Sequence, residues 1–143
     1  MIGVCPFSRI EEVVPVATRF FHYANESGSP SGEHWTAFWK SQYNSRMGVL
    51  FIETDANDTI IGFYGLVFFQ EPWTGDLVAQ EVCWYSEGSG GVRMLNEAEK
   101  MAKDCGAKVM YAQHLADDKS EKIQKFYTKK GFNLAYYKYR KEL

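Results

Sequence analysis

Apolar side chains in the first 45 residues repeat every three or four positions, which predicts two amphipathic helices. The first run consists of Ile10, Val13, Val14, Ala17, Phe20, Phe21 and Ala24. Ser8 precedes it with Glu11 three residues later, the pattern of a capping box, so Ser8 is the expected N-cap. Residues 25–32, rich in Ser, Gly and Pro, predict a loop. The second helix is marked by Trp35, Phe38, Trp39 and Tyr43.

Strand-like runs follow. Residues 49–52 and 59–69 flank turn-forming residues and predict a hairpin, and after a loop at 70–76 residues 77–85 predict another strand. A glycine-rich turn leads into a helix over 92–105 that ends at Gly106. The remaining pattern predicts a strand at 108–115, a helix over 117–130 that ends at Gly131, and a last strand at 132–139. This order predicts an α/β (α+β) fold, a mixed sheet with helices on both faces.

Composition narrows the class of protein. The chain has 143 residues, so we expect a single domain over 1–143. An aromatic content of 16% excludes a disordered chain. The formal net charge of -2 argues against a strongly basic nucleic-acid-binding protein, although a local basic patch is not excluded. The longest apolar run, 60–69, is too short to span a membrane, and no signal peptide is apparent.

The cysteines point to a reducing compartment. Cys5, Cys83 and Cys105 form no CxxC pair, and together with the three histidines they have no zinc-ligand spacing. We therefore expect a cytoplasmic protein without a metal.

The turn before the third predicted helix is the first feature with readable chemistry. Residues 86–91 read Ser-Glu-Gly-Ser-Gly-Gly. Free N–H groups at a helix start can hold a phosphate, and glycines let the backbone approach it closely. The pattern is neither of the common dinucleotide and triphosphate motifs, and an ordinary connector is the alternative. Arg93 in the first helical turn could assist binding or could be a solvated surface charge.

A tyrosine near the end of the chain is the second such feature. Tyr127 lies four residues before Gly131, in the last turn of the last predicted helix. A phenol at that position can donate a proton to a leaving thiolate. A core position is the alternative.

Together these features resemble the GNAT family of acyl-CoA-dependent N-acyltransferases, over nearly the whole chain. The family's pyrophosphate loop reads (R/Q)-x-x-G-x-(G/A)-x-x-L-L, and residues 86–95 match it in part. Gly91, Met94 and Leu95 fit this pattern, whereas Ser86 and Ser89 depart from it. These departures weaken the expected contribution of side chains to phosphate binding more than that of the backbone N–H groups.

Two further segments carry the resemblance. Tyr127-x-x-x-Gly131-Phe132 is similar to the segment that supplies the family's usual general acid. Residues 77–85 and the following loop are similar to GNAT-like proteins of phages and prophages.

The resemblance implies a mostly antiparallel central sheet with one splayed parallel strand pair, 77–85 and 108–115. Acyl-CoA would lie in the gap between these two strands. The resemblance further implies acetyl-CoA as co-substrate, no metal, and Tyr127 as catalytic acid. The implied cofactor-binding residues are, for pantetheine and the acyl carbonyl, the backbone of Val82, Cys83 and Trp84 and, for the pyrophosphate, Glu87, Gly88, Ser89, Gly90, Gly91 and Val92, with Arg93 beside them.

The implied reaction is direct attack of an amine on the thioester carbonyl. Because a lysine-like amine is mostly protonated at pH 7, a carboxylate must remove its proton, directly or through water. Glu81 is the first candidate for this base, because strand alternation predicts that Glu81, Cys83 and Tyr85 share a face. A surface carboxylate is the alternative.

Other residues in the same region could also act. Glu53 and Glu71 are further candidates for the base, and His114 could act as a base or contact pantetheine. Cys83 as a covalent nucleophile has no sequence partner, so a buried thiol is the preferred interpretation. Lysines of the last helix could attract phosphates or could simply be solvated; they are Lys119, Lys122 and Lys125.

The acceptor amine, whether a small molecule or a protein, is not specified. Large side chains could shape an acceptor site or belong to the core: Phe21, His22, Trp35, Trp39, Phe69 and Trp73. We expect no membrane partner. Nucleic acid is not an expected partner either, although the sequence does not exclude it. The sequence also leaves open whether the protein forms a homodimer. The alternatives are an interaction or regulatory module of the same fold that binds CoA weakly or not at all, and a nucleotide-binding regulator.

Overall fold

The computed structural model describes residues 1–24, 28–141 and 143. The chain divides into two compact units, Met1–Gln113 and His114–Leu143. A single domain over 1–143 stays a prediction, and part of the predicted loop at 25–32 lies outside the described residues.

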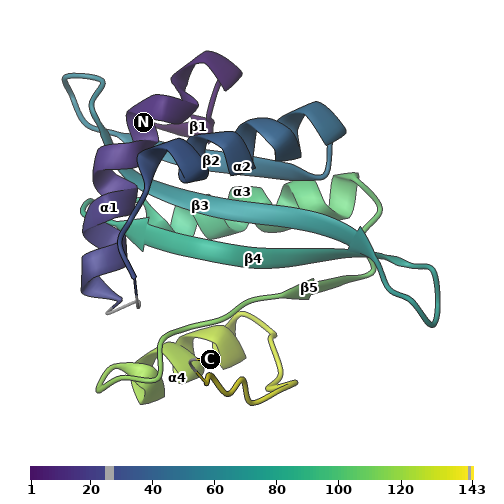
Figure 1. Ribbon diagram of the computed structural model, residues 1–143. Helices are drawn as coiled ribbons and strands as arrows, with labels where there is room; N and C mark the ends of the chain where they lie inside the picture. Colours follow the sequence, from purple (N-terminus) through teal and green to yellow (C-terminus); the bar gives the residue numbers. More distant parts are fainter. Residues whose placement is uncertain (25–27, 142) are drawn as a thin grey trace. The chain divides into compact units, whose positions relative to one another are not determined.

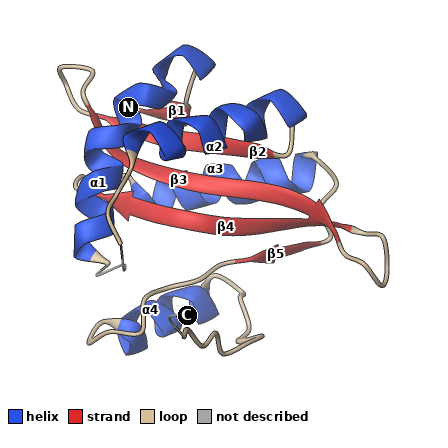
Figure 2. Ribbon diagram, viewed as in Figure 1, coloured by secondary structure: helices blue, strands red, loops and turns tan. Residues whose placement is uncertain are grey.

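The first unit contains a five-stranded sheet in the order β1-β2-β3-β4-β5 (Figure 2). Its strands are β1 (Ile2–Val4), β2 (Gly48–Thr54), β3 (Ile60–Gln70), β4 (Leu77–Ser86) and β5 (Val109–Tyr111). The first four are antiparallel neighbours, and β5 alone pairs parallel to its neighbour β4. The prediction of a mixed, mostly antiparallel sheet with one parallel pair is confirmed.

Helices cover both faces of this sheet (Figure 1). One face carries the 3₁₀ helix η1 (Phe7–Val13) and the helices α1 (Val14–Tyr23) and α2 (Gly32–Ser45). The other face carries α3 (Gly91–Asp104), whose buried side chains are Met94, Leu95, Ala98 and Ala102. Apolar residues at helical spacing therefore build one core on each side of the sheet.

The start of the chain differs from the prediction in two ways. The short edge strand β1 was not predicted, since three residues carry too little pattern to identify. The first helix begins as a 3₁₀ turn after Pro6 without a side-chain cap, so the prediction of Ser8 as N-cap is wrong. Arg9 donates its backbone N–H to the Pro6 carbonyl at 2.9 Å, which places Ser8 inside the first turn.

The second unit contains α4 (Ser120–Lys129), which ends as predicted at Gly131 with a positive φ of 88°. The predicted strand at 132–139 is wrong, because residues 132–141 form no strand. The tyrosines of this segment, Tyr136, Tyr137 and Tyr139, are exposed. Alternating aromatic residues favour a strand only when a neighbouring strand accepts their hydrogen bonds. The predicted strand at 108–115 is likewise shorter, and only Val109–Tyr111 pair.

Candidate functional site

The parallel pair separates partway along β4. Its last partners are Gln80 and Tyr111, while β4 continues to Ser86. Residues 81–86 therefore have no strand beside them on the β5 edge among the described residues. Backbone groups on that edge can bond to something other than a strand, which is the feature expected of an acyl-CoA site.

A β-bulge lies at the same point of β4. Gly65 of β3 pairs with Cys83, and the next residue, Leu66, pairs with Glu81, so Val82 is the extra residue. A bulge bends its strand and interrupts the alternation of side chains. On the open edge, the Val82 carbonyl accepts a hydrogen bond from the Gln113 side chain at 3.3 Å.

The bulge separates Glu81 from Cys83. The Cys83 side chain belongs to the core under α1 and α2, where Gly65 lies against the Trp39 ring. Glu81 is buried opposite Leu66, which belongs to the other face of the sheet. The expectation that Glu81 and Cys83 share a face is therefore wrong, because strict alternation does not pass through a bulge.

The Cys83 thiol is kept protonated by its surroundings. Burial raises its pKa well above the usual range, and the nearby Glu81 carboxylate raises it further. A thiol in this state is a poor nucleophile at neutral pH. Trp84, the next residue, faces α3, where its ring lies 5.8 Å from that of Tyr64.

The glycine-rich turn follows β4 directly and rests on a buried carboxylate. Glu53 of β2 accepts the Gly90 backbone N–H at 2.8 Å and the Ser86 hydroxyl at 2.5 Å. A Cβ on Gly90 would lie 2.6 Å from the Glu53 carboxyl carbon, and one on Gly88 would be closer still to a carboxylate oxygen. The absence of a Cβ at both positions therefore lets the Glu53 carboxylate approach the turn backbone closely, and a larger residue at either position would displace it. From the sequence, Glu53 is expected only as a possible base.

Several N–H groups of this turn have no hydrogen-bond partner among the described residues. Gly88 donates to the Ser86 hydroxyl at 3.1 Å, and Gly90 donates to Glu53. No hydrogen-bond acceptor within the described structure is recorded for the N–H groups of Ser89, Gly91, Val92 and Arg93. The first turn of α3 thus presents free donors and the positive end of its dipole, an arrangement that suits a phosphate.

Besides the buried Glu53, side-chain charge at the turn comes from two arginines and Glu87. Arg19 of α1 binds the Glu87 carboxylate through Nε at 2.5 Å and Nη2 at 3.1 Å. This bond lowers the pKa of Glu87 and raises that of Arg19. Arg93 is exposed in the first turn of α3. The sequence does not predict that Arg19 or Gln113 contacts this region, because both lie far along the chain from the residues that they bind, Glu87 and Val82.

The second unit positions Tyr127 among aromatic rings. Tyr127 is buried, and its ring packs edge-on against Phe132 at 5.2 Å and stacks on His114 at 6.3 Å. The His114 Nδ1 lies 2.9 Å from the Leu115 carbonyl, so that nitrogen carries a proton. The roles of Tyr127 and of the other predicted site residues stay predictions.

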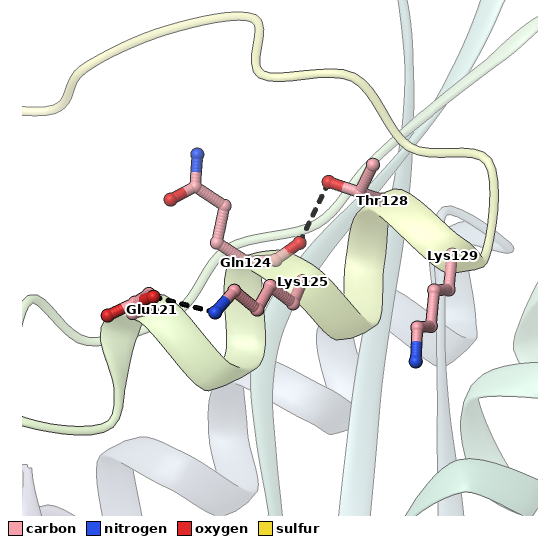
Figure 3. A pocket seen from close by; sticks show the side chains of 5 residues that line it. All are labelled: Glu121, Gln124, Lys125, Thr128 and Lys129. Carbon is pink, nitrogen blue, oxygen red and sulfur yellow. Dashed lines mark hydrogen bonds and ion pairs between the residues drawn. The ribbon is translucent and has the colours of Figure 1, made fainter.

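The other residues considered as a base or as part of an acceptor site lie in different surroundings. Glu71 accepts the backbone N–H groups of Trp73 and Thr74 and so stabilises its own loop. Trp39 and Trp35 pack in the core, whereas Trp73 is 93% exposed. A shallow hollow on α4 is lined by polar side chains, and within it Lys125 donates to Glu121 and the Thr128 hydroxyl donates to the Gln124 carbonyl (Figure 3); the lining residues are Glu121, Gln124, Lys125, Thr128 and Lys129.

The described residues contain neither a metal-binding cluster nor a helix able to span a membrane. No group of three or more His, Cys, Asp or Glu side chains there could hold a metal ion. No helix in the described part of the chain has the length and apolarity needed to cross a bilayer.

No protein-family model matches this sequence, and no curated protein matches it either. Solved structures match its fold over almost their full length. A probable acetyltransferase superposes with a TM-score of 0.78 at 17% identity, covering 100% of this chain and 97% of its own. A predicted acetyltransferase from Clostridium acetobutylicum, solved with acetyl-CoA, has a TM-score of 0.77 at 16% identity, with 99% and 96% covered. A transcriptional regulator from Bacillus halodurans C-125 has a TM-score of 0.76 at 16% identity, with 100% and 99% covered. The chain therefore has the GNAT fold.

Proposed function

We propose that this protein is a cytoplasmic N-acetyltransferase that transfers an acetyl group from acetyl-CoA to a primary amine by direct attack. The observation that carries the proposal is the junction at the end of β4. β5 stops pairing at Gln80, a bulge interrupts β4 at Val82, and the turn that follows Ser86 has N–H groups without an acceptor among the described residues. A structure with this fold contains acetyl-CoA.

Backbone groups would do most of the binding. Beyond Gln80, the open edge of β4 offers N–H and C=O groups to the amides of pantetheine, in the way that a strand would. The Val82 carbonyl now bonds to the Gln113 amide, which CoA would replace. The free N–H groups of residues 89 and 91–93 would hold the pyrophosphate.

Direct attack is favoured over an acyl-enzyme. Because burial keeps Cys83 protonated, it lacks the thiolate that covalent catalysis requires. The amine must instead be deprotonated and the CoA thiolate protonated. Tyr127 is the proposed acid. Glu81 is the proposed base, and because it is buried on the α3 face it would act through water.

Binding and catalysis are tested separately. Calorimetric titration with acetyl-CoA should give a saturable isotherm, and release of the CoA thiol against a panel of amines should identify an acceptor. Tyr127→Phe should then lower kcat about a hundredfold and leave the Kd for acetyl-CoA nearly unchanged. Tyr137→Phe removes the same hydroxyl from an exposed tyrosine of the same unit and should change neither value. Loss of acetyl-CoA binding in Tyr127→Phe would assign Tyr127 to structure.

An interaction or regulatory module is the second candidate. Ser86 and Ser89 depart from the loop pattern, and one structure with the same fold is described as a transcriptional regulator. Absence of acetyl-CoA binding at physiological concentrations would favour this candidate. Parallel titrations with ATP and NAD would expose a nucleotide-binding regulator.

A further inference from the structure

We propose that Arg19 is a phosphate-binding residue of this protein, and that its guanidinium replaces the basic side chain missing from the start of the glycine-rich turn. This inference rests on the proposed function, because it names a residue that would hold the CoA pyrophosphate. Arg19 lies on α1, about 70 residues before the turn, as the separation of 68 from Glu87 indicates.

The guanidinium is already at the turn. Its Nε and Nη2 donate to the two carboxylate oxygens of Glu87, at 2.5 and 3.1 Å. Glu87 is itself fixed, because its backbone N–H donates to the Ile61 carbonyl at 2.9 Å. The ion pair therefore holds the Arg19 guanidinium at Glu87, in the first half of the turn.

The guanidinium can bind a second anion without releasing the first. It has five N–H donors in one plane, and Glu87 uses two of them. The other three have no acceptor among the described residues. An arginine shared by a carboxylate and a phosphate can thus keep both contacts.

Charge balance at the turn requires such a cation. Glu53 lies beneath the turn and Glu87 within it, so two carboxylates oppose a bound pyrophosphate. Arg93 and Arg19 balance them. The first position of the turn is occupied by Ser86, whose hydroxyl bonds to Glu53 and Gly88 and carries no charge. Without Arg19, the side chains at the turn would have a net negative charge.

A double-mutant cycle separates phosphate binding from simple support of Glu87. Kd values for CoA are measured by calorimetry in the wild type, Arg19→Gln, Glu87→Gln and the double variant. Glu87→Gln should tighten binding, because it removes a repulsive charge. In that background Arg19→Gln should still raise the Kd about fivefold, the effect of losing one exposed charge-assisted contact. If Arg19→Gln has no effect once Glu87 is neutral, Arg19 only supports Glu87 and the inference is wrong.

Two measurements complete the test. Dephospho-CoA, which keeps the pyrophosphate, should show the same fivefold loss, and an effect confined to CoA itself would overturn the assignment to the pyrophosphate. Arg9→Gln is the matched control, because Arg9 also binds carboxylates, those of Glu12 and Asp58, and it should leave the Kd unchanged. If the wild type binds no CoA, the proposed function fails; if it binds CoA and the cycle shows no effect, only this inference fails.

Discussion

Glu53 is the buried carboxylate that supports the glycine-rich turn, and its removal should have two measurable effects. Glu53→Ala deletes the acceptor of the Gly90 N–H and of the Ser86 hydroxyl. A hydrogen bond to a charged group contributes about 1.5 kcal/mol or more, so two such bonds amount to about 3 kcal/mol. For a chain of this size, we expect a fall in Tm of about 9 °C.

The second effect is on ligand binding. The free N–H groups of the turn bind an anion only while the backbone is held in one geometry, so the Kd for CoA should rise about tenfold in Glu53→Ala. Glu53→Gln keeps an oxygen for Gly90 but loses the charge and the acceptor of the Ser86 hydroxyl, so we expect about 1.5 kcal/mol of destabilisation. Thermal unfolding and calorimetric titration measure both effects.

Glu97→Ala provides the matched control. Glu97 is an exposed carboxylate on α3, and its loss should change the free energy of unfolding by less than about 0.5 kcal/mol. If Glu53→Ala is as stable as Glu97→Ala and binds CoA as the wild type does, Glu53 does not support the turn, and our account of the glycines is wrong.

Three other predictions concern the first unit. Gly65→Ala would place a Cβ 2.5 Å from the buried Trp39 ring, and urea unfolding should give about 3 kcal/mol of destabilisation; a smaller loss than 1 kcal/mol would mean that the ring can move. Cys105, which is exposed, should react with a thiol reagent at pH 7, while Cys83 should react only after unfolding. Rapid labelling of Cys83 in the native protein would contradict this and would support a mechanism through an acyl-enzyme. The lowered pKa of Glu87 means that its ion pair stabilises the fold at neutral pH, and that this contribution is lost as the pH falls through the lowered pKa of the folded state. Glu87→Gln should therefore be less stable than the wild type at pH 7, and the difference should shrink as the pH is lowered; a difference that does not change with pH would contradict this assignment.

The sequence identified the elements whose pattern is local. The hairpin of β2 and β3, the strand β4, and the helix α3 with its end at Gly106 follow from spacing and from glycine alone. These elements repeat a side-chain period over many residues, and glycine at a helix end has a local steric reason. The same information predicted the mixed sheet, because the hairpins and the helical crossover leave few topologies.

Predictions from the local sequence pattern were wrong where the structure of a segment depends on the strand that pairs with it. Residues 132–139 alternate like a strand but form none, since a strand exists only through its hydrogen bonds to another strand. The bulge at Val82 is equally invisible in the sequence, because it depends on the register with Gly65 and Leu66. Because of that register, the Glu81 side chain lies on the face of the sheet opposite Cys83.

The candidate site divides in the same way. The sequence by itself determined the glycine-rich turn between a strand and a helix, because a run of glycine and serine fits neither element and the flanking periods identify both. Only the tertiary structure brought Glu53 of β2 beneath that turn and Arg19 of α1 beside it. Contacts between residues far apart in the chain depend on how the helices and strands pack against one another, so the spacing of residues in the sequence does not predict them.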